Sequence, residues 1–140
     1  MAVKSSENLL MVADSEHDAN MLYAVGMFVP DPFIYLRLRG RSTIVMSDLE
    51  IDRARKQAPH CRAISLSACF RKLREAGRTR PNHAQVIRAI LRERGFRRIL
   101  VPHNFPLGMA EELKRLGVFV KVKRGGFFPE REQKSPAEVK

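Results

Sequence analysis

Cysteine is scarce in this chain of 140 residues, since only Cys61 and Cys69 are present and they lie eight residues apart. That spacing matches no zinc motif, and a disulfide framework needs more than two cysteines. We therefore expect two reduced, partly buried thiols, as is usual in a cytoplasmic protein.

Long apolar runs are also missing. No stretch approaches the roughly 18 apolar residues that a membrane-spanning helix needs. The apolar residues near the N-terminus are few and acidic residues follow at once, which is not the pattern of a secretory signal. The sequence thus predicts no membrane segment, and its 44% of hydrophobic residues can fill the core of one domain.

The sequence offers no recognisable catalytic or cofactor motif. Its glycines form neither GxGxxG nor a phosphate-binding loop, and no serine has a GxSxG context. The histidines are far apart and none has a second ligand at helical spacing: His17, His60, His83 and His103. The acidic clusters 14–18 and 48–52 precede expected helices, where carboxylates interact favourably with the helix dipole. We therefore expect this chain alone to bind no metal or other cofactor and to catalyse nothing.

Positive charge is abundant but unevenly distributed. The net charge is +11; residues 53–98 carry fourteen Lys or Arg against two acids, whereas residues 1–52 carry a net charge of −4. Such a block allows a free-standing basic α/β module that binds nucleic acid or an acidic partner. Base stacking needs interleaved aromatics, and the block has only Phe70 and Phe96, both at core-like positions. We therefore do not expect nucleic acid to be the partner, although the basic-module alternative stays open.

Periodicity predicts strands that alternate with helices. The expected strands are 8–13, 33–38, 42–47, 61–66, 97–102 and 118–123, and the expected helices are 15–28, 48–58, 67–77, 83–95 and 107–117. Ser15 is the expected N-cap of the first helix, and Ser47 with Glu50 forms a capping-box pattern. Strands 33–38 and 42–47 flank a Gly-containing turn and should form a hairpin. The pattern predicts an α/β domain with three α/β/α layers and a mixed, mainly parallel sheet.

The last residues, "KSPAEVK", have the signature of a helix N-terminus, with Ser135 as N-cap, Pro136 at the first position and Glu138 three residues after the cap. Only two residues follow Glu138, fewer than a helix needs. We therefore expect a domain boundary, with one domain over residues 1–128 and a linker plus the first turn of a following helix over 129–140.

The C-terminal stretch resembles the end of the N-terminal domain in the creatinase, prolidase and aminopeptidase P family. There a strand, a helix and a strand lead through an "R-x-x-K-S-P-x-E" linker into a catalytic domain. The matching linker residues are Arg131, Lys134, Ser135, Pro136 and Glu138. Upstream, Asn20, Tyr23 and Gly26 match the family's "N-x-x-Y-x-x-G-F" helix and turn, while Met27 stands at the Phe position and Phe28 follows one residue later.

The resemblance implies a ribonuclease-H-like creatinase N-terminal domain that is not itself catalytic. A parent Xaa-Pro peptidase of this kind would cleave short proline-containing peptides with two divalent ions (Mn, Co or Zn), held in a C-terminal domain that is covalently linked to this one. The family's N-terminal domains help to form a homodimer and restrict the active-site cleft. The candidate cleft or subunit-contact residues are Phe28, Pro30, Asp31 and Phe33.

Overall fold

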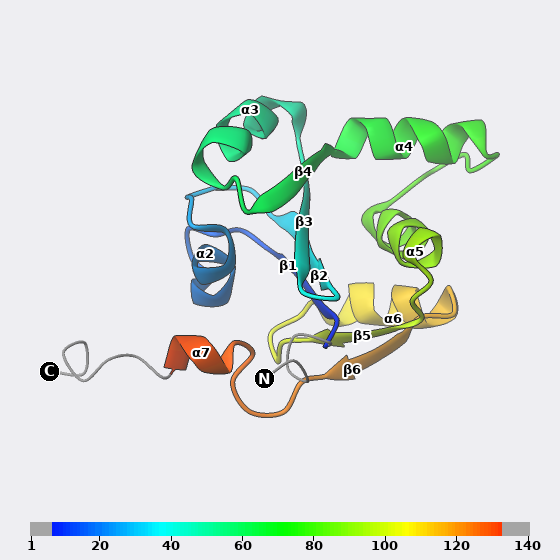
Figure 1. Ribbon diagram of the computed structural model, residues 1–140. Coiled ribbons are helices and arrows are strands. Elements are labelled where there is room, and N and C mark those ends of the chain that lie inside the picture. Colours follow the sequence, from blue (N-terminus) through cyan, green and yellow to red (C-terminus); the bar gives the residue numbers. More distant parts are fainter. Residues whose placement is uncertain (1–6, 133–140) are drawn as a thin grey trace, which may run out of the picture.

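The computed structural model describes residues 7–132, which form a six-stranded sheet with helices packed against it (Figure 1). The strands are β1 (Leu9–Ala13), β2 (Phe33–Leu38), β3 (Arg41–Met46), β4 (Cys61–Ser65), β5 (Arg98–Val101) and β6 (Phe119–Val122). The helices are α2 (Ala19–Val25), α3 (Asp48–Gln57), α4 (Leu66–Glu75), α5 (His83–Arg94), α6 (Leu107–Arg115) and α7 (Pro129–Glu132). None of these helices is long and apolar enough to cross a bilayer.

The strand order is β4-β3-β2-β1-β5-β6. The pairs β3–β4, β1–β5 and β5–β6 are parallel, whereas β1–β2 and β2–β3 are antiparallel. Strands β2 and β3 form the predicted hairpin, whose turn residues Arg39 and Gly40 both have positive φ, as a two-residue hairpin turn prefers. The mixed, mainly parallel α/β fold predicted from the sequence is confirmed.

Two hydrophobic cores lie on opposite faces of the sheet because side chains alternate along each strand. Leu9, Met11 and Ile44 pack with α2 and α3 on one face. Leu10 and Leu36 pack with α5 and α6 on the other face. Figure 1 shows α2 and α3 on one side of the sheet and α5 and α6 on the other.

The first helix begins later than expected. It starts at Ala19, and its N-cap is Asp18, whose carboxylate accepts a hydrogen bond from the Met21 N–H at 2.9 Å. The predicted N-cap, Ser15, is buried in a turn before the helix. Gly26 ends α2 in the left-handed conformation, with φ at 78°, which glycine adopts without steric cost.

The capping box predicted at Ser47 and Glu50 does not form. Ser47 is the N-cap of α3, but its side chain makes no cap hydrogen bond. The Glu50 carboxylate instead accepts hydrogen bonds from Nε and Nη2 of Arg53, at 3.0 and 2.6 Å. A charged partner one turn away has taken the carboxylate that the box needs. The capping box of this fold lies at α5, between Asn82 and Gln85.

Candidate interdomain junction and surface loop

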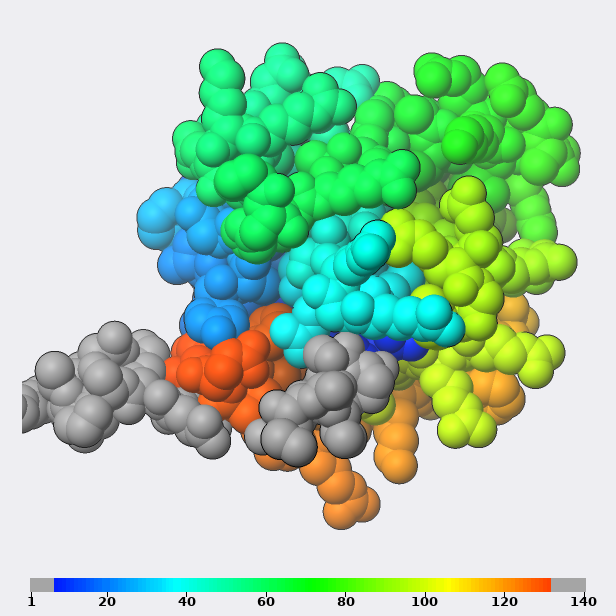
Figure 2. Space-filling model, viewed as in Figure 1, coloured from blue at the N-terminus to red at the C-terminus, as the bar shows by residue number. Residues whose placement is uncertain are grey.

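The segment after the last strand returns to the body of the domain. Phe127 and Phe128 are both buried, Phe128 at 1% exposure. The Phe128 ring lies 5.3 Å from the ring of Tyr23 in α2 and 6.3 Å from that of Tyr35 in β2, and the Arg37 guanidinium lies 5.4 Å from its centre. In Figure 2 this segment (orange-red) fills the space beside α2 (blue) and the hairpin strands (cyan). Aromatic burial thus fixes the position from which α7 begins.

Polar contacts tie α7 to the same two elements. The Arg131 Nε donates a hydrogen bond to Asn20 Oδ1 at 3.2 Å, joining residues that are 111 positions apart. A Glu130 carboxylate oxygen lies 3.7 Å from Arg37 Nη1. The buried Arg37 Nε has no hydrogen-bond partner within the described residues. The guanidinium instead contacts the ring of Phe128 and the carboxylate of Glu130.

The two tyrosines around Phe128 both have phenols with a raised pKa. Burial raises the pKa of Tyr23, and the nearby negative charge of Glu130 raises it further. Tyr35 also has a raised pKa, mainly because it is removed from water. Its hydroxyl lies 2.8 Å from Ser42 Oγ. These phenols are therefore packing and hydrogen-bonding groups at neutral pH rather than bases.

Two sequence motifs separated by most of the chain meet at this junction. Asn20 of the early helix motif contacts Arg131, the first residue of the predicted linker motif, and Tyr23 of the helix motif contacts Phe128, three residues before it. Lys134, Ser135, Pro136 and Glu138, the other predicted linker residues, lie outside the described residues. Sequence reasoning missed Arg37 and Phe128, although the double aromatic "FF" before the polar tail was a signal for a buried anchor.

The predicted contact loop, between α2 and β2, is firmly held at its base. The Ser15 hydroxyl donates to the Met27 carbonyl at 2.6 Å and accepts from the Val29 N–H at 2.7 Å. Arg53 Nη2 donates to the Phe28 carbonyl at 2.7 Å. A carbonyl held by a charged donor and a neighbouring N–H held by a buried hydroxyl leave this loop little freedom.

The loop presents one aromatic side chain to solvent. Phe28 is 58% exposed, and Pro30 and Asp31 are exposed beside it. Phe33 is different, because it lies in β2 at 3% exposure and packs in the core with α2 and α3. Three of the four predicted contact residues thus lie at the surface, and Phe33 is a core residue whose ring does not reach solvent.

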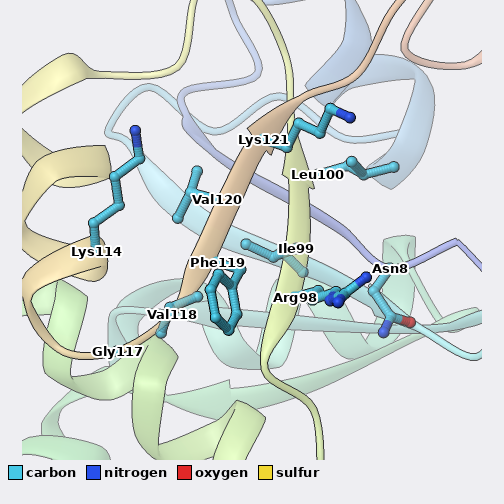
Figure 3. Close-up of a pocket in the computed structure, with 10 residues that line it drawn as sticks. All are labelled: Asn8, Arg98, Ile99, Leu100, Lys114, Gly117, Val118, Phe119, Val120 and Lys121. Atoms are coloured by element: carbon cyan, nitrogen blue, oxygen red, sulfur yellow. The ribbon is translucent and has the colours of Figure 1, made fainter.

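A hollow of about 760 Å³ lies at the β5–β6 edge of the sheet (Figure 3). Leu100 of β5 and the 61% exposed Phe119 of β6 line it, and Arg98, Lys114 and Lys121 surround them. The Arg98 guanidinium lies 6.0 Å from the centre of the Phe119 ring. The lining contains no Ser, Thr, Cys, His, Asp or Glu side chain, so this hollow offers contact surface and positive charge but no pairing of a nucleophile with a base.

The described residues also do not fit a two-metal centre. Between residues 7 and 132 there is no group of three or more His, Cys, Asp or Glu side chains that could hold a metal ion. Three of the four histidines have other contacts: His17 with Asp14, His60 with the Ala24 carbonyl, and His83 with Phe70. A dinuclear site needs several carboxylates that converge on one point, and residues 7–132 contain no such group.

Comparison with known proteins places this fold. No protein-family model matches the sequence, and no curated protein matches it either. Solved structures do match. The X-Pro aminopeptidase of Thermotoga maritima superposes with a TM-score of 0.69 at 9% identity, over 98% of this chain and 35% of its own. The Xaa-Pro dipeptidase of Bacillus anthracis does so with a TM-score of 0.66 at 10% identity, over 99% of this chain and 35% of its own.

A separately solved domain matches over most of both chains. The N-terminal, creatinase/prolidase-like domain of a Corynebacterium diphtheriae protein superposes with a TM-score of 0.57 at 15% identity, over 90% of this chain and 89% of its own. The chain therefore has the α/β fold of a creatinase/prolidase-type N-terminal domain. More particularly, the chain spans 35% of the length of each of the two peptidase chains above, so its fold corresponds to about a third of such a chain.

Proposed function

We propose that this chain is the non-catalytic N-terminal domain of a metal-dependent Xaa-Pro peptidase of the prolidase or aminopeptidase P kind. The observation that carries the proposal is the superposition of 98–99% of this chain on 35% of two such peptidases. The remainder of the parent would be a C-terminal catalytic domain with two divalent ions, Mn, Co or Zn. The described part of this chain provides no cluster of ligands for them.

Residues 127–132 would be the exit from this domain. Phe128 is buried between Tyr23 and Tyr35, and Arg131 is hydrogen-bonded to Asn20, so the chain leaves from a fixed point. The rest of the matched linker, Lys134 to Glu138, would then begin the catalytic domain. A fixed exit restrains the orientation of a following domain more than a flexible linker does.

The loop of Phe28, Pro30 and Asp31 would contact the active-site cleft or a second subunit of a homodimer. An exposed aromatic on a restrained loop loses little conformational entropy on contact, which favours such a role. In this position it would limit the cleft to short proline-containing peptides.

The first experiment compares this chain with the protein encoded by the full reading frame. We expect the purified 140-residue chain to show no Xaa-Pro dipeptide hydrolysis with added Mn²⁺ or Co²⁺, and the full-length protein to show it. Turnover by the chain alone would contradict the non-catalytic assignment. A full reading frame without the two Asp, one His and two Glu ligands of the peptidase class would contradict the parent assignment.

A second experiment tests the loop in the active full-length protein. We expect Phe28→Ala to relax the preference for short over long Xaa-Pro peptides, with kcat for a dipeptide changed less than about twofold. Phe119→Ala, which removes another exposed phenylalanine far along the chain, is the matched control and should leave the preference unchanged. Equal preferences in all three proteins would contradict the cleft role, and an unchanged dimer mass in sedimentation would contradict the subunit role.

A further inference from the structure

Helix α4 is packed less completely than its neighbours. Its apolar side chains repeat at helical spacing, yet none of its residues is fully buried, and Cys69 and Leu73 remain half-buried. Figure 1 shows α4 running out from the end of β4, with α5 returning below it. A helix usually buries its apolar side chains against a partner. Because no α4 residue is fully buried, this side of α4 is only partly covered.

A trough of about 610 Å³ lies along this side of α4. It is bounded by α4, α5 and β4, and its apolar lining includes Ile64, Ala68, Cys69, Leu73, Val86 and Ile90. This volume is typical of pockets that hold small molecules, which measure roughly 300–1,000 Å³. The apolar lining favours an aliphatic chain or a ring as the occupant.

Positive charge gathers at the rim of the trough. Arg62, Lys72 and Arg94 line it, against the single acid Glu93. None of these four residues forms an ion pair within residues 7–132. Among the described residues, the one hydrogen-bond acceptor near the Arg94 guanidinium is the buried Thr43 hydroxyl, at 3.5 Å from Nη2, which is a long contact. The guanidinium groups therefore keep most of their hydrogen-bonding capacity.

The cations are concentrated where the trough meets a second hollow. That hollow, of about 640 Å³, shares Thr43, Arg62 and Arg94 with the trough and adds Arg41. Three arginines thus lie around one end of an apolar channel. Guanidinium groups match carboxylate geometry with two parallel hydrogen bonds, and they attract an anion before contact.

We propose that the trough between α4 and α5 binds a small organic anion with an apolar body, of the medium-chain carboxylate class. The apolar body lies along α4 and α5, and the carboxylate lies at Arg62 and Arg94. A neutral apolar ligand would leave these cations without a counter-charge, and a small inorganic anion would leave the apolar lining wet. This site is separate from the junction at Phe128 and the loop at Phe28, so it is independent of the peptidase proposal.

The test uses the 140-residue chain and decanoate below its micelle concentration. Calorimetry should detect saturable binding of one decanoate. Cys69 lines the trough, so decanoate should slow its alkylation by iodoacetamide at least threefold, as followed by peptide mass spectrometry. Two control ligands should each give less than a tenth of this protection. Inorganic phosphate has an anionic group but no apolar tail, and decyltrimethylammonium has the tail but a positive charge.

Variants locate the two parts of the site. Arg94→Gln should weaken decanoate binding about tenfold, the effect of losing one charge-assisted contact. Arg92→Gln removes an exposed arginine from the same turn of α5, outside the trough, and should leave the affinity within twofold. Ala89→Phe fills the trough and should abolish binding while the melting temperature stays unchanged.

Several results would overturn the proposal. These are no saturable decanoate binding, binding that leaves Cys69 alkylation unchanged, and equal losses in Arg94→Gln and Arg92→Gln. Equal protection by phosphate would show that the site recognises the anion alone. Equal protection by decyltrimethylammonium would show that it is apolar only. Each readout is a binding or labelling measurement, so the outcome does not depend on whether the parent is a peptidase.

Discussion

At the scale of single residues, Ser15 connects the turn before α2 to the loop after it. Its side chain is 1% exposed and bonds to both the Met27 carbonyl and the Val29 N–H, while its own N–H donates to the Val29 carbonyl at 3.1 Å. The loop that carries Phe28 is therefore held from a position 13 residues earlier in the chain.

We expect Ser15→Ala to lower the free energy of unfolding by ~1–3 kcal/mol, because the Val29 N–H would stay buried without its hydroxyl acceptor. Urea denaturation followed by circular dichroism measures the change. Ser67→Ala is the control, since that hydroxyl is exposed, and its effect should stay within about 0.5 kcal/mol. A Ser15 variant as stable as the Ser67 variant would show that the buried hydroxyl contributes little.

The buried thiol of Cys61 makes the free energy of unfolding depend on pH in the alkaline range. Burial raises the pKa of this thiol from 9.0 to about 11. As the pH rises from 9 to 11, the unfolded chain releases the thiol proton before the folded chain does. The contribution of Cys61 to the free energy of unfolding is therefore fully present below pH 9 and is lost between pH 9 and 11. Cys61→Ala should therefore lose less stability than the wild type between pH 9 and 11.

The measurement is the urea midpoint at several pH values, with reductant present. The quantity compared is the difference between the wild type and Cys61→Ala, because other groups, such as Tyr35 with its raised pKa, are present in both proteins. Burial also raises the pKa of Cys69, so Cys69→Ala, which keeps Cys61, should lose a smaller part of the pH dependence than Cys61→Ala does. Parallel curves for the wild type and Cys61→Ala would contradict the prediction.

At the scale of elements, α3 and α5 begin in different ways. Asn82 Oδ1 accepts from the Gln85 N–H at 2.9 Å, and Gln85 Oε1 accepts from the Asn82 N–H at 3.2 Å. Ser47 makes no equivalent bond. We expect Asn82→Ala to cost ~1 kcal/mol and Ser47→Ala only a few tenths, as measured by urea denaturation. Equal costs would show that the Ser47 hydroxyl caps α3 in solution after all.

The elements themselves could be predicted because their signals are local. Alternating apolar residues and the glycine of the 39–40 turn define the β2–β3 hairpin, and Gly95 marks the end of α5. The hydrogen-bond partners could not be predicted in the same way. Glu50 has the spacing of a capping box, but Arg53 competes for its carboxylate and also reaches the Phe28 carbonyl across 25 residues.

Much of the candidate site depends on contacts between segments that are distant in the sequence. Asn20 and Tyr23 matched a family pattern, but nothing local showed that they meet Arg131 and Phe128. The arginines of the trough were visible only as part of a basic block. Their grouping around an apolar channel follows from how α4 and α5 diverge, which periodicity does not reveal.

At the scale of the whole molecule, the positive charge is concentrated in one part of the chain, residues 53–98. Of the fourteen basic residues between 53 and 98, eleven lie in α3, β4, α4, α5 and β5, two lie in the connection between α4 and α5, and one directly precedes β5. Phe70 and Phe96 in this region are half-buried against the core, which leaves few rings for base stacking. The positive region is therefore better suited to carboxylates than to nucleobases, and it raises the local concentration of anions around the trough.

The last whole-molecule feature is the coupling between the C-terminal segment and the core. Phe128 packs with residues of α2 and β2 and belongs to the same core cluster as Leu9 of the first strand. The segment after β6 is thus part of the cooperative unit rather than an appendage. We expect Phe128→Ala to destabilise the domain by ~3–5 kcal/mol, the usual cost of truncating a buried phenylalanine.

Phe119→Ala is the matched comparison, because the same ring is lost from a 61% exposed position, and it should change stability by less than about 1 kcal/mol. Urea denaturation gives both values, and cleavage by trypsin after Arg131 gives the second readout. If α7 depends on the Phe128 anchor, cleavage there should accelerate in Phe128→Ala and stay unchanged in Phe119→Ala. A stable Phe128→Ala protein with unchanged cleavage would mean that Arg131–Asn20 and Glu130–Arg37 hold the exit without the ring.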